Sequence, residues 1–136
     1  MSTETVPTIV VAYSADEFGR AALRQAAEEA RHRGARLVVV NATRGDALVD
    51  RRFAADDEVV ALEQQLTGEG LEVDVRHEVV RDVADAVVEV ATQEHAALLV
   101  VGVRHRTPVG KVLLGSVAQR VILDAPCPVL SVKPPR

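Results

Sequence analysis

The sequence predicts an α/β fold in which one parallel β-sheet is covered by helices on both faces. Two patterns lead to this prediction. Short apolar runs, which are typical of strands buried on both faces, alternate with longer segments in which apolar residues recur every three or four positions. The predicted element order is βαβαβαβαβ. No linker, repeat or low-complexity tract interrupts it, so residues 1–136 are expected to form a single domain.

The first half of the chain begins with two predicted strands that flank a helix. Residues 8–13, TIVVAY, are a continuous apolar run, and residues 16–33 carry one helical stripe that ends before Gly34. Residues 36–42 form a second apolar run. The polar, arginine-rich residues 43–53 that follow are expected to form a loop.

A second helix and a third strand of different character come next. Residues 55–66 carry a helical stripe that Gly68 or Gly70 would end. Residues 71–80 alternate strictly, with one charged face, and a strand of this kind is expected at an edge of the sheet. The residues of the charged face are Glu72, Asp74, Arg76 and Glu78.

The remaining elements are two helices and two strands. Residues 83–91 and 116–122 carry helical stripes. Residues 97–102 form the most apolar strand and are expected at the centre of the sheet, and residues 127–133 form the last strand. Aromatic residues make up only 2% of the chain, so the core must consist of Val, Leu, Ile and Ala.

Composition narrows the class of function. The net charge of −4 argues against a general nucleic-acid binder. No apolar run approaches the roughly 20 residues that cross a bilayer, and the N-terminus lacks the basic region of a secretory signal. A single cysteine, Cys127, excludes an intramolecular disulfide. We therefore expect a cytoplasmic protein with no membrane or nucleic-acid partner.

One long window contains no carboxylate. Glu94 and Asp124 bound it, although the chain has 20 Asp and Glu residues. Its basic residues are Arg104, Arg106, Lys111 and Arg120. A local positive field in an acidic protein indicates a small anionic ligand.

Two loops are candidates for the ligand site, because open α/β sheets bind ligands beyond the carboxyl ends of their strands. In the first loop, Ser14 and Glu17 have the spacing of a capping box. In the second, Gly115 lets backbone come close and Ser116 opens a helix whose unpaired amides suit a phosphate. A turn glycine followed by an N-cap serine is also a common structural pattern. Gly102 ends the central strand and permits close approach.

No catalytic residue and no metal site is predicted. Gly110-Lys111 resembles the end of a P-loop, but Val112 stands where Ser or Thr is needed, and no GxGxxG is present. The four histidines show no spacing that pairs them as ligands. Slow ATP hydrolysis is the most that the sequence allows, and no general base is nominated.

Three segments resemble the universal stress protein (UspA-like) family along essentially the whole chain. They are IVVAYSADEFGRAALRQAAEEARHRGARLVVVNA, AALLVVGVRHR and GKVLLGSVAQRVILDAPCPVLSVKP. The resemblance implies an adenine nucleotide alpha-hydrolase-like, Rossmann-like sandwich with strand order 3-2-1-4-5. It also implies a homodimer.

The nucleotide-binding branch of that family carries Gly, two residues, Gly, nine residues, then Gly-Ser or Gly-Thr. Gly102, Gly115 and Ser116 match this pattern, but His105 replaces the second glycine, and Ser14 replaces the aspartate usual after the first strand. Ala42 matches the residue that frames adenine. The candidate nucleotide-binding residues are Ala12, Ser14, Ala42, Gly102, Arg104, His105, Gly115, Ser116 and Val117.

Two hypotheses of function follow. The first is a cytoplasmic stress-response protein that binds ATP or another adenine nucleotide, with Mg²⁺ only if ATP is bound, and acts as a regulatory dimer. The second is a nucleotide-independent interaction module whose phosphate loop is degraded at Ser14 and His105. In either case residues 127–133, an edge strand uncharged until Lys133, are expected to pair with a second copy.

Overall fold

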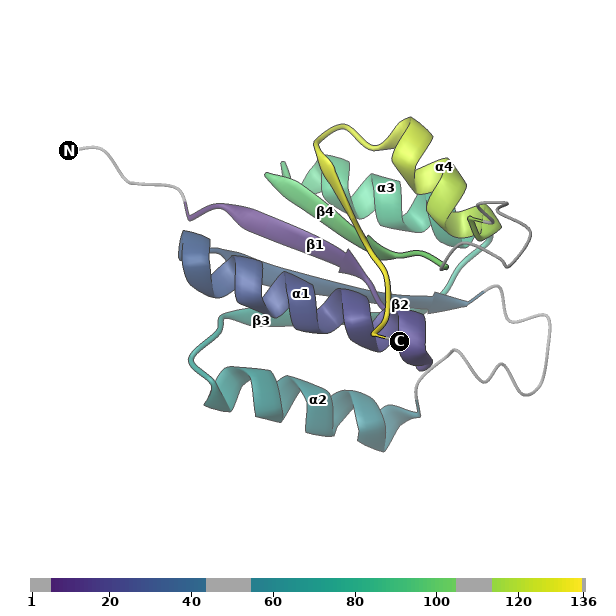
Figure 1. The fold of residues 1–136 in the computed structure, drawn as a ribbon. Coiled ribbons are helices and arrows are strands. Elements are labelled where there is room, and N and C mark those ends of the chain that lie inside the picture. The colour runs from purple at the N-terminus through teal and green to yellow at the C-terminus, as the bar shows by residue number, and fades with distance from the viewer. Residues whose placement is uncertain (1–5, 44–54, 105–113, 136) are drawn as a thin grey trace.

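The computed structural model describes residues 6–43, 55–104 and 114–135, and Figure 1 shows their arrangement. The elements are β1 (Thr8–Ala12), α1 (Glu17–Arg33), β2 (Arg36–Thr43), α2 (Asp56–Gly68), β3 (Val73–Val79), α3 (Val83–Gln93), β4 (Leu98–Gly102), α4 (Ser116–Asp124) and β5 (Val129–Val132). The strands form one parallel sheet in the order β3-β2-β1-β4-β5. The predicted fold class and strand order are confirmed.

Each face of the sheet is covered by two helices (Figure 1). Ile9 and Val11 of β1 belong to the core that α1 and α2 cover, whereas Val10 belongs to the core beneath α3 and α4. All three side chains are fully buried. Because successive residues of a strand point to opposite faces, a strand covered on both sides is apolar along most of its length. This explains why the central strands read as continuous apolar runs.

Three helices end in the same hydrogen-bonded turn. Gly34, Gly70 and His95 each adopt positive φ, of 60°, 90° and 50°. The amide of the next residue then donates to a carbonyl in the last turn, as in a Schellman motif. These bonds are Ala35 to Ala30 (2.9 Å), Leu71 to Leu66 (3.2 Å) and Ala96 to Ala91 (2.9 Å). The predicted stop at Gly34 is confirmed, and the stop of α2 involves Gly68 as its last residue and Gly70 as the left-handed turn.

The charged strand β3 lies at an edge of the sheet, as predicted. Its Arg76 pairs with Asp74 at 3.2 Å and donates to Glu94, the residue that follows α3. Arg36 of β2 donates to the same carboxylate at 2.6 Å. The hydrogen bond from Arg76, supported by Arg36, lowers the pKa of Glu94. The charged face is therefore tied to α3 by an ion-pair network.

Several smaller expectations can be compared with the structure. Of the predicted loop 43–53, Thr43 is the last residue of β2, and the rest lies outside the described residues. β5 begins at Val129, so Cys127 precedes it and packs, half-buried, against the core beneath α3 and α4. This burial raises the pKa of the Cys127 thiol. In the part of the chain that the structure describes, no helix is long and apolar enough to span a bilayer.

Candidate functional site

A cleft of about 740 Å³ lies at the carboxyl ends of the central strands. Its walls come from the ends of β1, β2 and β4 and from the first turns of α1, α3 and α4. The volume falls within the range of small-molecule sites. The described candidate residues all line it: Ala12, Ser14, Ala42, Gly102, Arg104, Gly115, Ser116 and Val117. His105 lies outside the described residues, as do Arg106 and Lys111.

The start of α1 corrects one prediction. The helix is capped by Asp16, whose Oδ1 accepts the Gly19 amide at 2.9 Å. Ser14 donates its hydroxyl to the same Oδ1 at 2.7 Å. The predicted capping box of Ser14 and Glu17 is wrong, because Ser14 lies two residues before the N-cap and orients the capping carboxylate. The sequence did carry the relevant signal, an aspartate immediately before the helical stripe.

The close approach predicted at Gly102 takes place within the protein itself. A Cβ at Gly102 would lie 2.4 Å from the carbonyl oxygen of Phe18. A Cβ at Gly19 would lie 1.9 Å from the carbonyl oxygen of Ser14. These glycines let the first turn of α1 pack on the end of β4 and on the loop after β1. Packing alone therefore accounts for glycine at position 102.

Gly115 behaves differently. Among the described residues, no atom comes within 4 Å of a Cβ built on Gly115. Its φ of −62° is open to any residue, so neither crowding nor backbone conformation requires glycine here. Gly115 is the N-cap of α4 and lines the cleft. As far as the described residues go, the space beside Gly115 is open to a ligand.

The three helices that begin at the cleft differ in how they are capped. Asp16 caps α1, and Asp82 caps α3 by accepting the Asp85 amide at 2.9 Å. α4 begins after Gly115, and no side chain in the described part of the protein caps it. The first amides of a helix attract anions, and a capping carboxylate already accepts a hydrogen bond from one of these amides in α1 and in α3. Within the described cleft, α4 presents the helix terminus best suited to an anionic ligand.

Part of the positive charge in the carboxylate-free window is ion-paired within the protein. Arg120 lines the cleft, but its guanidinium donates to Asp82 at 2.8 Å and to Asp85. The fold therefore brings carboxylates of residues 82 and 85 against a window that has none of its own. Arg104 lies with its guanidinium 5.3 Å from the centre of the Phe18 ring, where a cation–π contact positions it at the cleft.

Sequence reasoning missed several residues of the cleft wall. They are Tyr13, Asp16, Phe18 and Asp82. Tyr13 is mostly buried, and burial, with the charge of Glu58, raises the pKa of its phenol. Asp82 could have been found as an aspartate directly before a helical stripe. No local sequence pattern predicts that Phe18 lines the cleft, because in the sequence it is one more apolar residue of the α1 stripe.

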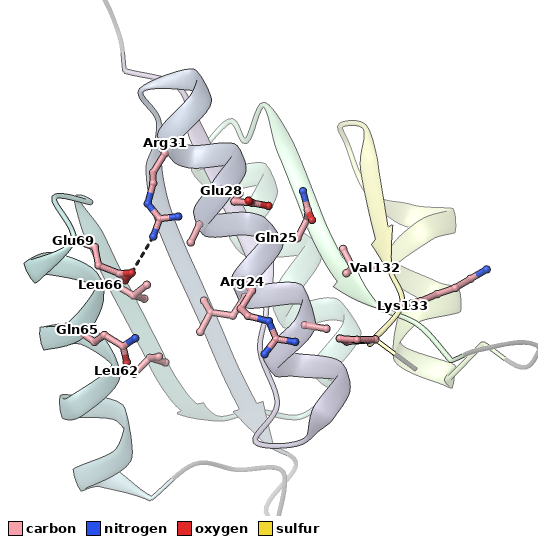
Figure 2. A pocket seen from close by; sticks show the side chains of 14 residues that line it. Arg24, Gln25, Glu28, Arg31, Leu62, Gln65, Leu66, Glu69, Val132 and Lys133 are labelled. Carbon is pink, nitrogen blue, oxygen red and sulfur yellow. Dashed lines mark hydrogen bonds and ion pairs between the residues drawn. The ribbon is translucent and has the colours of Figure 1, made fainter.

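A second hollow, of about 650 Å³, lies between α1, α2 and the end of β5 (Figure 2). Arg31 and Glu69 bridge α1 and α2 there at 3.0 Å. Its deeper apolar residues, Leu23 and Leu66, already belong to the core beneath these helices. None of the candidate residues that the structure describes lines it. Within residues 6–43, 55–104 and 114–135, no cluster of three or more His, Cys, Asp or Glu side chains could hold a metal ion.

From β1 the chain adds β2 and β3 on one side of the sheet and β4 and β5 on the other, so the strand order reverses at β1. The cleft lies at this switch point, where open α/β sheets bind ligands. The molecule is thus an α/β protein of the adenine nucleotide alpha-hydrolase-like fold. The chain belongs to the universal stress protein family, whose model matches residues 5–133.

Individual relatives agree with this assignment. A universal stress protein from Mycolicibacterium smegmatis is 52% identical over 126 residues, which are 93% of this chain and 97% of that protein. A universal stress protein from Archaeoglobus fulgidus, solved in complex with dAMP, is 28% identical with a TM-score of 0.61, covering 96% of this chain and 100% of the other. A universal stress protein solved in complex with cAMP is 27% identical with a TM-score of 0.69, covering 97% and 100%.

Proposed function

We propose that the protein is a cytoplasmic stress-response protein that binds an adenine nucleotide in the cleft and acts as a regulatory dimer. The observation that carries nucleotide binding is the start of α4, which has no side-chain cap among the described residues and lies beside the open space at Gly115. The relatives solved with dAMP and cAMP support adenine nucleotides as the ligand class.

The capping pattern supports one orientation of the ligand. Its phosphate lies at Gly115 and Ser116, where helix amides attract an anion. The carboxylate of Asp16 repels phosphate from the start of α1, so the uncharged nucleoside lies on that side, against Ala12, Ser14 and Ala42. Arg104, which is exposed and lies over the Phe18 ring, adds a positive charge to the cleft.

ATP and other adenine nucleotides all carry the phosphate and the nucleoside that this orientation requires. Mg²⁺ is expected only with ATP, as a counterion of its phosphates. We assign no catalytic residue. The cleft wall offers Asp16 and Asp82 as carboxylates, and both are engaged in capping helices. The proposed activity is therefore binding, with slow ATP hydrolysis as its upper limit.

The proposed dimer forms through β5. β5 is an edge strand, and its residues are uncharged. Leu123, at the end of α4 shortly before it, is one of the most exposed apolar side chains of the described chain, at 73%. A second copy related by a twofold axis would pair antiparallel with this edge and extend the sheet.

The direct test of nucleotide binding is to denature purified protein and analyse the extract by absorbance and chromatography. We expect an adenine nucleotide in the extract, or its uptake when the protein is incubated with AMP or ATP and desalted. Protein that neither carries nor retains any adenine nucleotide would contradict the proposal.

That negative outcome would favour a second candidate, a nucleotide-independent interaction module of the same fold. The observation behind it is the pair of carboxylates, Asp16 and Asp82, at the cleft. These carboxylates disfavour an anionic ligand, and Ser14 and His105 depart from the pattern of the nucleotide-binding branch.

A further inference from the structure

Arg120 is placed to reach the phosphate end of the proposed nucleotide. It lies four residues after Ser116 on α4, so the two residues share one face of the helix. Cα–Cβ bonds tilt toward the N-terminus of a helix, which directs the Arg120 side chain back to the turn that Ser116 begins. Both residues line the cleft.

In the structure this guanidinium is bound to the first turn of α3. One of its nitrogens donates to Oδ2 of Asp82 at 2.8 Å, and another donates to Asp85. The two oxygens of Asp82 have separate tasks, because Oδ1 caps α3 while Oδ2 holds Arg120. The backbone amide of Asp85, with Arg120 adding to it, lowers the pKa of Asp82, so its carboxylate is charged at neutral pH.

These ion pairs are exposed and therefore weak. The Arg120 side chain is 44% exposed and that of Asp85 is 65% exposed. Solvent and salt screen such pairs, whereas a guanidinium binds phosphate through two parallel, charge-assisted hydrogen bonds. A phosphate at the start of α4 can therefore compete with Asp85 for Arg120.

We propose that Arg120 recognises the phosphate of the bound nucleotide by exchanging its ion pair with Asp85 for that phosphate. The proposal rests on the proposed function, and it adds a residue that discriminates nucleotides from nucleosides. Asp85 then acts as a competitor that weakens phosphate binding without contacting the ligand.

A double-mutant cycle tests this exchange. AMP and adenosine are titrated by calorimetry into wild type, Asp85→Asn, Arg120→Gln and the double variant. We expect Asp85→Asn to raise AMP affinity about threefold and Arg120→Gln to lower it roughly tenfold. In the Arg120→Gln background, Asp85→Asn should change AMP affinity by less than about twofold. Adenosine affinity should stay the same in all four proteins.

Matched controls are available at the opposite end of α1. Glu69→Gln and Arg31→Gln make the same charge changes in an ion pair remote from the cleft (Figure 2), and they should leave AMP affinity unchanged. An AMP affinity that Arg120→Gln does not alter overturns the proposal. So does an effect of Asp85→Asn that persists undiminished in the Arg120→Gln background, since general repulsion would then explain it. Wild type that binds neither AMP nor adenosine overturns the proposed function itself.

Discussion

Ser14 donates its hydroxyl to Oδ1 of Asp16 at 2.7 Å, and that oxygen also accepts the first-turn amide of Gly19. The helix cap and the wall of the cleft are thus one hydrogen-bonded unit. Asp16→Ala should lower the free energy of unfolding by about 1 kcal/mol, because it leaves the start of α1 uncapped. Ser14→Ala should cost less, since Asp16 keeps its bond to Gly19.

Urea denaturation monitored by circular dichroism measures both changes. Glu17→Ala is the control, because Glu17 is exposed in the first turn and was assigned to a capping box that the structure does not form. Its effect should stay within about 0.5 kcal/mol. If Glu17→Ala destabilised the protein as much as Asp16→Ala, the assignment of the cap would be wrong.

His95 holds a left-handed backbone conformation that two glycines hold at the other helix ends. Its φ is 50°, which is costly for a residue with a Cβ. His95→Gly should therefore raise the free energy of unfolding by about 0.5–1 kcal/mol. Gly70→Ala, the reverse change at φ 90°, should lower it by about 1 kcal/mol. A thermal melt of each variant checks the pair, and destabilisation by His95→Gly would refute the argument.

The fold was predictable from the sequence because its signals are local. Ile9, Val10 and Val11 lie in a strand buried on both faces, and such a strand is read from sequence as an apolar run. The ion pairing of Arg120 with Asp82 was not predictable. Its partner Asp82 lies 38 residues away in sequence, and only the packing of α4 beside α3 brings them together.

The glycines of the candidate site also separate what sequence predicts from what tertiary packing decides. Sequence spacing singled out both Gly102 and Gly115, but it could not say what approaches each of them. The structure gives Phe18 as the neighbour of Gly102 and, among the described residues, open space beside Gly115. Tertiary packing decides this difference, which no local pattern records.

The Glu94 network should make stability depend on pH. The pKa of Glu94 is lowered in the folded protein, so its contribution is complete above the ordinary glutamate value of about 4.3 and is lost as pH falls through the folded-state pKa. Glu94→Gln should cost roughly 1 kcal/mol at pH 7. Denaturation of both proteins from pH 7 to pH 3 should show this difference shrinking toward zero. A difference that stays constant would mean that packing, and not charge, stabilises the site.

The proposed dimer can be tested at the free edge of β5. Pro128 and Val132 accept hydrogen bonds from β4, so alternation along the strand turns the amides of Val129 and Ser131 outward. Ser131→Pro should therefore convert a dimer to a monomer at micromolar concentration while leaving the sheet paired. Sedimentation velocity measures the shift. Val79→Pro, on the exposed edge strand β3, is the control and should remain dimeric. A monomeric wild type would contradict the dimer.

Calorimetric titration of AMP into wild type and Gly115→Val tests the central claim most directly. Because no described atom lies within 4 Å of a Cβ at Gly115, valine should leave the fold intact while filling the space proposed for the phosphate. Valine is a poorer N-cap than glycine, so the melting temperature should fall by only a few degrees. We expect binding by wild type and a loss of about 100-fold or more in Gly115→Val. Gly68→Val, at a second open glycine remote from the cleft, should bind like wild type. Equal AMP affinity in wild type and Gly115→Val would show that the nucleotide does not bind at the start of α4.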